Sequence, residues 1–123
     1  MLIAADYSDV QKLGAELLSI ADKISQMTPE ISKAQMIRDF SSDRRKRALA
    51  KAVLPFLSSG ESAAAAEHKA RALPAYGAEL QALGDDLRSA EDVIARHAAL
   101  KTKWESVRSL LSIQKALTAN LQG

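Results

Sequence analysis

The chain has 123 residues, a formal net charge of +2 and no cysteine, so it can form neither disulfides nor thiolate metal sites. Hydrophobic residues make up 47 % of it, but aromatic residues only 4 %. This length suits a single domain, or a small helical head with a helical extension. Abundant alanine and scarce glycine favour helix over sheet, because alanine loses no side-chain entropy in a helix. We therefore predict an all-α protein.

The start of the chain, Met1 to Asp6, has neither the basic nor the apolar region of a signal peptide. No apolar run reaches the roughly 18 residues of a membrane-spanning helix. We therefore expect a cytoplasmic protein.

The first predicted helix runs from about Asp9 to Met27. Ser8 is its expected N-cap, with Gln11 completing a capping box. Apolar residues at steps of three and four predict one buried stripe. These residues are Val10, Leu13, Leu17, Ile20, Ile24 and Met27.

The second predicted helix begins at Pro29, because threonine at position 28 can cap it and proline is tolerated in a first turn. A break at Ser41 to Asp43 is possible, but we favour continuity or a slight kink. Pro55 and then Ser58-Ser59-Gly60 are expected to end the helix. Its apolar face is predicted to comprise Ile31, Ala34, Ile37, Phe40, Ala48, Leu49, Ala52, Val53 and Phe56.

A short third helix is predicted from Ala63 to Ala72, capped by Ser62. Pro74 is then expected to start a long helix that extends to Leu121, because the residue before a proline is disfavoured in the α region. One continuous helix kinked at Pro74 is the alternative.

The long helix carries apolar residues at alternating steps of four and three, as in a heptad seam. The seam shifts by one residue near Ala90 to Ile94. Its first part comprises Tyr76, Leu80, Leu83, Leu87, Ala90 and Ile94, and its second part comprises Val93, His97, Leu100, Trp104, Val107 and Leu111.

At ~1.5 Å per residue the long helix would extend ~70 Å, and the first two helices would cover only part of it. We therefore expect self-association, with a dimer as the first guess. The predicted interface residues are Leu80, Leu83, Leu87, Ile94, Leu100, Trp104, Val107 and Leu111. The expected architecture is a helical bundle or hairpin whose long C-terminal helix forms a coiled-coil-like assembly. Residues 1–60 would form an N-terminal hairpin and residues 61–123 the short and long helices, within one structural unit.

The formal positive excess comes from one short segment that contains five basic residues and one acidic residue. The basic residues are Arg44, Arg45, Lys46, Arg47 and Lys51. On a helix, Arg44, Arg47 and Lys51 share one side, where they could neutralise phosphates. We name the five as candidate nucleic-acid-binding residues. A solvated basic face with no partner is the alternative, since no aromatic residue interleaves to stack on bases.

No pattern indicates catalysis, a metal or a cofactor. His68 and His97 lie 29 residues apart, and no pair of histidines has zinc-ligand spacing. The acidic residues of the long helix have basic neighbours at helical spacing, so we expect surface ion pairs of Asp85 with Arg88 and of Asp92 with Arg96. Neither a catalytic residue nor a small-molecule substrate is therefore assigned.

Trp104 is the only tryptophan and lies among the basic residues Lys101, Lys103 and Arg108. Its place on the stripe of Leu100 and Val107 favours a packing role. Stacking on a base or anchoring a protein interface is the alternative.

Residues 66–112 resemble a group of small helical accessory proteins of bacteriophages and prophages. The resemblance rests on three stretches. They are Ala66-Glu67-His68-Lys69-Ala70-Arg71-Ala72, Pro74-Ala75-Tyr76 with the leucine-rich helix that follows, and Trp104-Glu105-Ser106-Val107-Arg108-Ser109. Such proteins often accompany recombination and single-strand-binding functions, so the resemblance implies an intracellular helper in DNA metabolism.

These observations lead to two hypotheses. The first is a non-enzymatic phage-type binding module in DNA recombination or replication, which contacts DNA or a DNA-processing protein. The second is a structural or assembly protein, whose long helix mediates homo-oligomerisation without touching nucleic acid. Neither requires a membrane or a cofactor.

Overall fold

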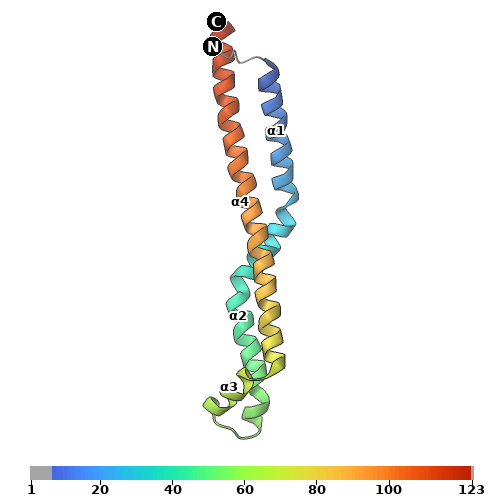
Figure 1. Cartoon of the computed structure of the whole chain (residues 1–123), viewed down its shortest axis with the longest axis vertical. Helices are drawn as coiled ribbons and strands as arrows, with labels where there is room; N and C mark the ends of the chain where they lie inside the picture. Colours follow the sequence, from blue (N-terminus) through green and yellow to red (C-terminus); the bar gives the residue numbers. More distant parts are fainter. Residues whose placement is uncertain (1–6, 123) are drawn as a thin grey trace. The chain divides into compact units, whose positions relative to one another are not determined.

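The computed structural model describes residues 7–122, and all secondary structure in this range is helical (Figure 1). Helix α1 spans Tyr7–Gln26, α2 spans Thr28–Ser58, α3 spans Ala63–Arg71 and α4 spans Pro74–Gln122. The prediction of an all-α protein with a long C-terminal helix is confirmed. Within the described residues, no helix is long and apolar enough to cross a membrane.

Most predicted helix boundaries agree with the structure. Helix α2 continues through Ser41 to Asp43, and α4 begins at Pro74 rather than running on from α3. The expected N-cap at Ser8 is wrong, because α1 already starts at Tyr7 and Ser8 lies in its first turn. Pro55 does not end α2 either. It lies inside the helix, one turn before the end at Ser58.

The chain divides into two compact units. Unit 1 combines residues 7–30 with residues 95–122, so α1 packs with the second part of α4. Unit 2 comprises Ile31–Ile94, in which α2, α3 and the first part of α4 pack together (Figure 1). The two units do not follow the boundary at residue 60 between the two helical parts named from the sequence, because each unit joins segments that are distant in the chain.

The predicted seam of α4 is buried or half-buried along its whole length. In unit 2, Tyr76, Leu83 and Ala90 have exposed fractions of 5, 9 and 3 %. In unit 1, Val107 has an exposed fraction of 6 %. Val93 and Ile94 are both half-buried, which is the predicted one-residue shift of register.

The residues predicted as an interface between copies therefore pack within the single chain. All eight are buried or half-buried. Neither α1 nor α2 alone is long enough to cover the whole of α4. However, α1 has 20 residues, α2 has 31 and α4 has 49, and α1 and α2 pack on different parts of α4. Covering this seam needs no second copy, and homo-oligomerisation stays a prediction.

The apolar face of α2 was predicted correctly except at Phe40, whose side chain is 54 % exposed. The covered residues step by seven from Ala34 through half-buried Ser41 to Ala48. Phe40 lies one residue, about 100° of helical rotation, away from that line. The buried alanines, at 3 % and 5 % exposure, provide small contact points on this face.

The end of α2 is fixed by a Schellman motif. Gly60 has a φ of +86°, and its N–H donates to the carbonyl of Leu57 at 3.0 Å. The N–H of Glu61 reaches back to the carbonyl of Phe56 at 3.2 Å. The hydroxyl of Ser59 donates to the carbonyl of Pro55 at 3.0 Å. These bonds satisfy carbonyls that a helix end would otherwise leave without partners.

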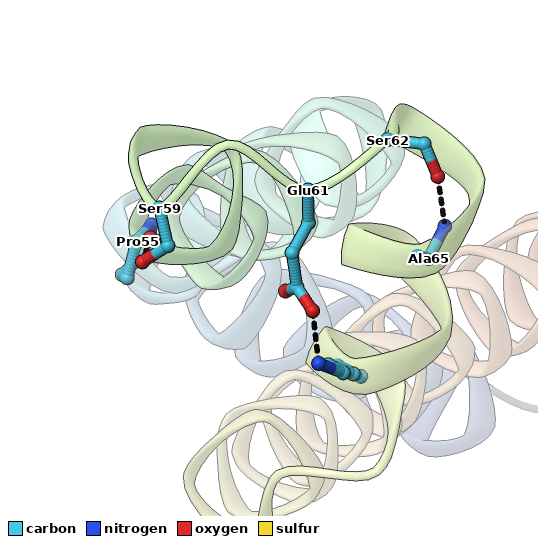
Figure 2. A network of polar contacts seen from close by, with 6 residues as sticks. Pro55, Ser59, Glu61, Ser62 and Ala65 are labelled. Carbon is cyan, nitrogen blue, oxygen red and sulfur yellow. Dashed lines mark hydrogen bonds and ion pairs between the residues drawn. The ribbon is translucent and has the colours of Figure 1, made fainter.

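The start of α3 follows directly. Ser62 accepts a hydrogen bond from the N–H of Ala65 at 3.3 Å, as predicted (Figure 2). Glu61 forms an ion pair with Lys69, which ties the connecting loop to α3. Ala66 and Ala70 are completely buried, so the inner face of α3 consists of small side chains. Unit 2 is therefore closed at this end by a short helix that packs tightly on its neighbours.

Candidate nucleic-acid interface

Three of the five candidate phosphate-binding residues lie together in the structure. Arg44, Arg47 and Lys51 project from α2 into one surface groove of about 240 Å³. The α4 side of this groove is formed by Glu79, Ala82 and Leu83, and Ala48 lies between the basic residues. The steps of three and four residues place the cations ~4.5 and ~6 Å apart along the helix axis. The sequence prediction of a shared side for these three residues is confirmed.

Arg44 is oriented by an acidic residue of the other helix. Its two terminal nitrogens donate to Oδ2 of Asp86, each at 3.2 Å. The two side chains are 41 % and 51 % exposed, so solvent screens the pair and it contributes little to stability. Asp86 therefore fixes the direction of the guanidinium while leaving it accessible. Helical spacing in the sequence could not predict this partner, because the two residues are 42 positions apart.

Arg45 and Lys46 are exposed but do not line the groove. They add positive charge to the same stretch of α2 without sharing its groove-facing side. The five residues therefore form one basic segment with two parts: a trio in the groove, and a pair outside it.

The charges of α4 complement the basic segment of α2. In residues 74–94 the helix has one basic residue, Arg88, and five acidic residues, namely Glu79, Asp85, Asp86, Glu91 and Asp92. In residues 95–122 it has one acidic residue, Glu105, and five basic residues, namely Arg96, Lys101, Lys103, Arg108 and Lys115. The basic segment of α2 thus packs in the unit that contains the acidic part of α4. Part of its charge is the electrostatic complement of its own neighbour, as the Arg44–Asp86 pair shows.

Contacts within α4 agree with the sequence where they were predicted. Arg88 forms an ion pair with Asp85. Trp104 is half-buried on the seam, and the guanidinium of Arg108 lies 5.5 Å from the centre of its ring. This cation–π contact supports the packing role of Trp104. The predicted pair of Asp92 with Arg96 stays a prediction.

A row of exposed cations on α4 was not singled out by the sequence analysis. Lys101, Arg108 and Lys115 follow one another at intervals of seven residues, or ~10.5 Å. None of them belongs to an ion pair among the described residues. They are spaced more widely than the trio of α2 and share no groove with it. This row is a natural comparison surface for any test of phosphate binding.

The two histidines lie in ordinary helical surroundings. His68 is exposed on α3, and His97 is half-buried on the α4 seam. Near His68, Glu67 accepts a 2.7 Å hydrogen bond from Arg71, and this bond raises the pKa of the Arg71 guanidinium. Across residues 7–122, no three or more His, Cys, Asp or Glu side chains are grouped as a metal site would require.

Comparisons with protein-family models, with curated proteins and with solved structures give no match for this chain.

Proposed function

We propose that this protein is a non-enzymatic helical binding module that contacts the phosphates of a nucleic acid through the groove of Arg44, Arg47 and Lys51. The observation that carries this proposal is the convergence of three exposed cations on one groove, with one of them oriented by Asp86. Guanidinium and ammonium groups at such spacing can displace the counterions of a phosphate chain. Exposed Arg45 and Lys46 would strengthen the local positive potential.

The resemblance to phage accessory proteins is the reason for placing such a contact in DNA recombination or replication, and in the cytoplasm. In this proposal, the residues that contact DNA directly are those of the α2 groove. The half-buried position of Trp104, with Arg108 over its ring, does not favour base stacking as the main contact. The contact should therefore read the phosphate backbone and depend little on base sequence.

The test is fluorescence anisotropy with labelled single- and double-stranded oligonucleotides at low and at physiological salt. The variant Arg44→Gln/Arg47→Gln/Lys51→Gln removes the groove cations. We expect it to weaken binding and to lower the slope of log K against log salt by about two to three, because each lost phosphate contact lowers it by about 0.7 to 0.9. The control variant Lys101→Gln/Arg108→Gln/Lys115→Gln removes the same charge from α4.

The two variants distinguish nucleic-acid binding at the α2 groove from general electrostatic attraction to a basic protein. A loss confined to the α2 variant supports the proposal. Equal losses in both variants would show that binding follows net charge alone and would contradict the assignment to the groove. Absence of binding by the unaltered protein at low salt would refute nucleic-acid contact altogether.

An assembly role is the second candidate. The seam of α4 is covered within the chain, so assembly would require another face. Leu110, Ile113 and Leu117 favour this candidate, because they are 51, 56 and 44 % exposed on the same helix. Leucine and isoleucine side chains repeating at steps of three and four are typical of helix-to-helix contacts.

A further inference from the structure

A second stripe runs along the part of α4 that belongs to unit 1, beside the covered seam. It follows the same alternating steps of four and three residues. Its members are Ala99, Lys103, Ser106, Leu110, Ile113 and Leu117. All six are exposed, and the three large apolar side chains lie in its C-terminal half. We call these residues the open stripe.

The N-terminal half of the open stripe borders a mainly apolar groove of about 350 Å³. Met27, which lies between α1 and α2, and Ala99 and Leu100 from α4 supply its apolar lining. Arg96 and Lys103 contribute basic side chains to the same groove. One end of the stripe is therefore hollow and positively charged, whereas the other end carries the protruding side chain of Leu117.

Beside the open stripe, α1 carries acidic residues, and these lie near the end of the stripe that is farther from the basic groove. Met27 directly follows α1 and continues its last turn, because its N–H donates to the carbonyl of Lys23 at 3.2 Å. Glu16 precedes Met27 by eleven residues, which is three helical turns, so Glu16 lies on the side of α1 that borders this groove. Since α1 and α4 run in opposite directions within unit 1 (Figure 1), Glu16 lies level with about residue 111. Asp9 lies seven residues further along the same row, and Lys12 partly offsets these two acids.

From this arrangement we infer that the open stripe is the interface of an antiparallel dimer between two copies of this chain. A two-fold axis near residue 108 places Leu117 of one copy in the groove at Ala99 of the other. It also places Leu110 opposite Ser106, and Ile113 opposite the aliphatic stem of Lys103. Large side chains then meet small ones or a groove in every layer, as interdigitation of helices requires.

The same axis brings opposite charges together. Glu16, level with residue 111, comes within one helical turn of Lys103 of the second copy, and the reciprocal pair forms by symmetry. A face that is acidic at one end and basic at the other is complementary to itself under two-fold rotation. A parallel arrangement would set the basic end against itself.

Sedimentation equilibrium of the full chain tests this interface. We expect a mass of twice 13.2 kDa for the unaltered protein. Leu117→Lys should give a monomer, because the ammonium group would enter an apolar groove beside Arg96 and Lys103 of the second copy. Leu18→Lys is the matched control, since Leu18 is 70 % exposed on α1 outside the open stripe, and it should leave the dimer unchanged. Trp104 fluorescence verifies that each variant remains folded.

A charge exchange tests the orientation. Glu16→Lys and Lys103→Glu should each weaken dimerisation by roughly ten-fold, as expected for an exposed pair turned into repulsion, and the double variant should restore it. Ala99→Leu should also weaken the dimer by filling the groove that receives Leu117. A monomeric unaltered protein at its highest soluble concentration would overturn the proposal. A dimer insensitive to Leu117→Lys, or single charge variants that the double variant does not rescue, would overturn it equally.

Discussion

Arg44 of α2 and Asp86 of α4 form a hydrogen-bonded ion pair across unit 2, with both terminal guanidinium nitrogens 3.2 Å from one carboxylate oxygen. The pair links the basic segment to the acidic part of α4. It also orients the guanidinium of Arg44 in the groove. Its carboxylate competes with any phosphate that approaches Arg44.

Replacing Asp86 with asparagine should therefore strengthen nucleic-acid binding. The variant removes a competing negative charge, and the gain should be at most about five-fold, the equivalent of an exposed ion pair of ~1 kcal/mol. The free energy of unfolding should change by less than ~1 kcal/mol for the same reason. Anisotropy titrations and urea unfolding measure the two effects. An unaltered affinity in a protein that does bind DNA would show that Arg44 does not contact phosphate.

The covered seam and the open stripe of α4 should respond differently to the same substitution. Val107→Asp places a carboxylate at a site with 6 % exposure and should lower the free energy of unfolding by more than ~2 kcal/mol. Leu110→Asp, three residues away and 51 % exposed, should change the stability of the monomer by less than ~0.5 kcal/mol.

The fluorescence of Trp104, which lies in the same unit as both sites, follows this comparison during urea unfolding. The measurements are made at low protein concentration, so that loss of a dimer does not contribute to the change in unfolding free energy caused by Leu110→Asp. Equal effects of the two variants would contradict the packing of the seam within one chain.

Gly60→Ala should destabilise unit 2. The residue has a φ of +86°, where a side chain costs about 1–2 kcal/mol, and nothing lies within 4 Å to obstruct the added methyl group. The cost is therefore purely conformational. Gly77→Ala is the matched control, since Gly77 is an exposed residue inside α4 and its surroundings are equally open.

The control should stabilise the protein by ~0.5–1 kcal/mol, because alanine is the better helix former. Far-UV circular dichroism during urea unfolding reports both changes. Opposite signs for the two glycines are the expected result, and a stabilising Gly60→Ala would refute the Schellman end of α2.

Ala66→Leu should destabilise the protein by ~1–3 kcal/mol. Ala66 has no exposed surface, so a larger side chain must displace the helices packed around α3. Ala64→Leu, two residues earlier on an exposed face, should be nearly neutral. Circular dichroism under urea again provides the measurement, and a neutral Ala66→Leu would show that α3 does not pack closely.

Much of the fold followed from local chemistry. The structure confirms the all-α fold that the alanine-rich composition predicted. It also confirms the apolar stripes of α1 and α4, Ser62 as a cap and Pro74 as a helix start. It was also predictable that Arg44, Arg47 and Lys51 share one side of α2, because helical spacing alone puts them together.

Other features were out of reach of the sequence because they depend on residues far apart in the chain. The exposure of Phe40 is decided by which line of α2 its neighbours cover, and it lies one residue off that line. Glu79 lines the groove and Asp86 pairs with Arg44 only because α4 packs beside α2.

The sequence by itself therefore determined the helices, the Ser62 cap of α3 and the heptad stripe of α4, because these depend on contacts within a few residues. Only the tertiary structure decided what covers that stripe: α2 in unit 2 and α1 in unit 1. A periodic apolar stripe specifies that a helix must be covered but does not specify by which partner, since its own chain and a second copy offer the same kind of surface. The open stripe could be identified only from the structure, which shows that the heptad seam of α4 is covered within the chain and that the stripe beside it is exposed.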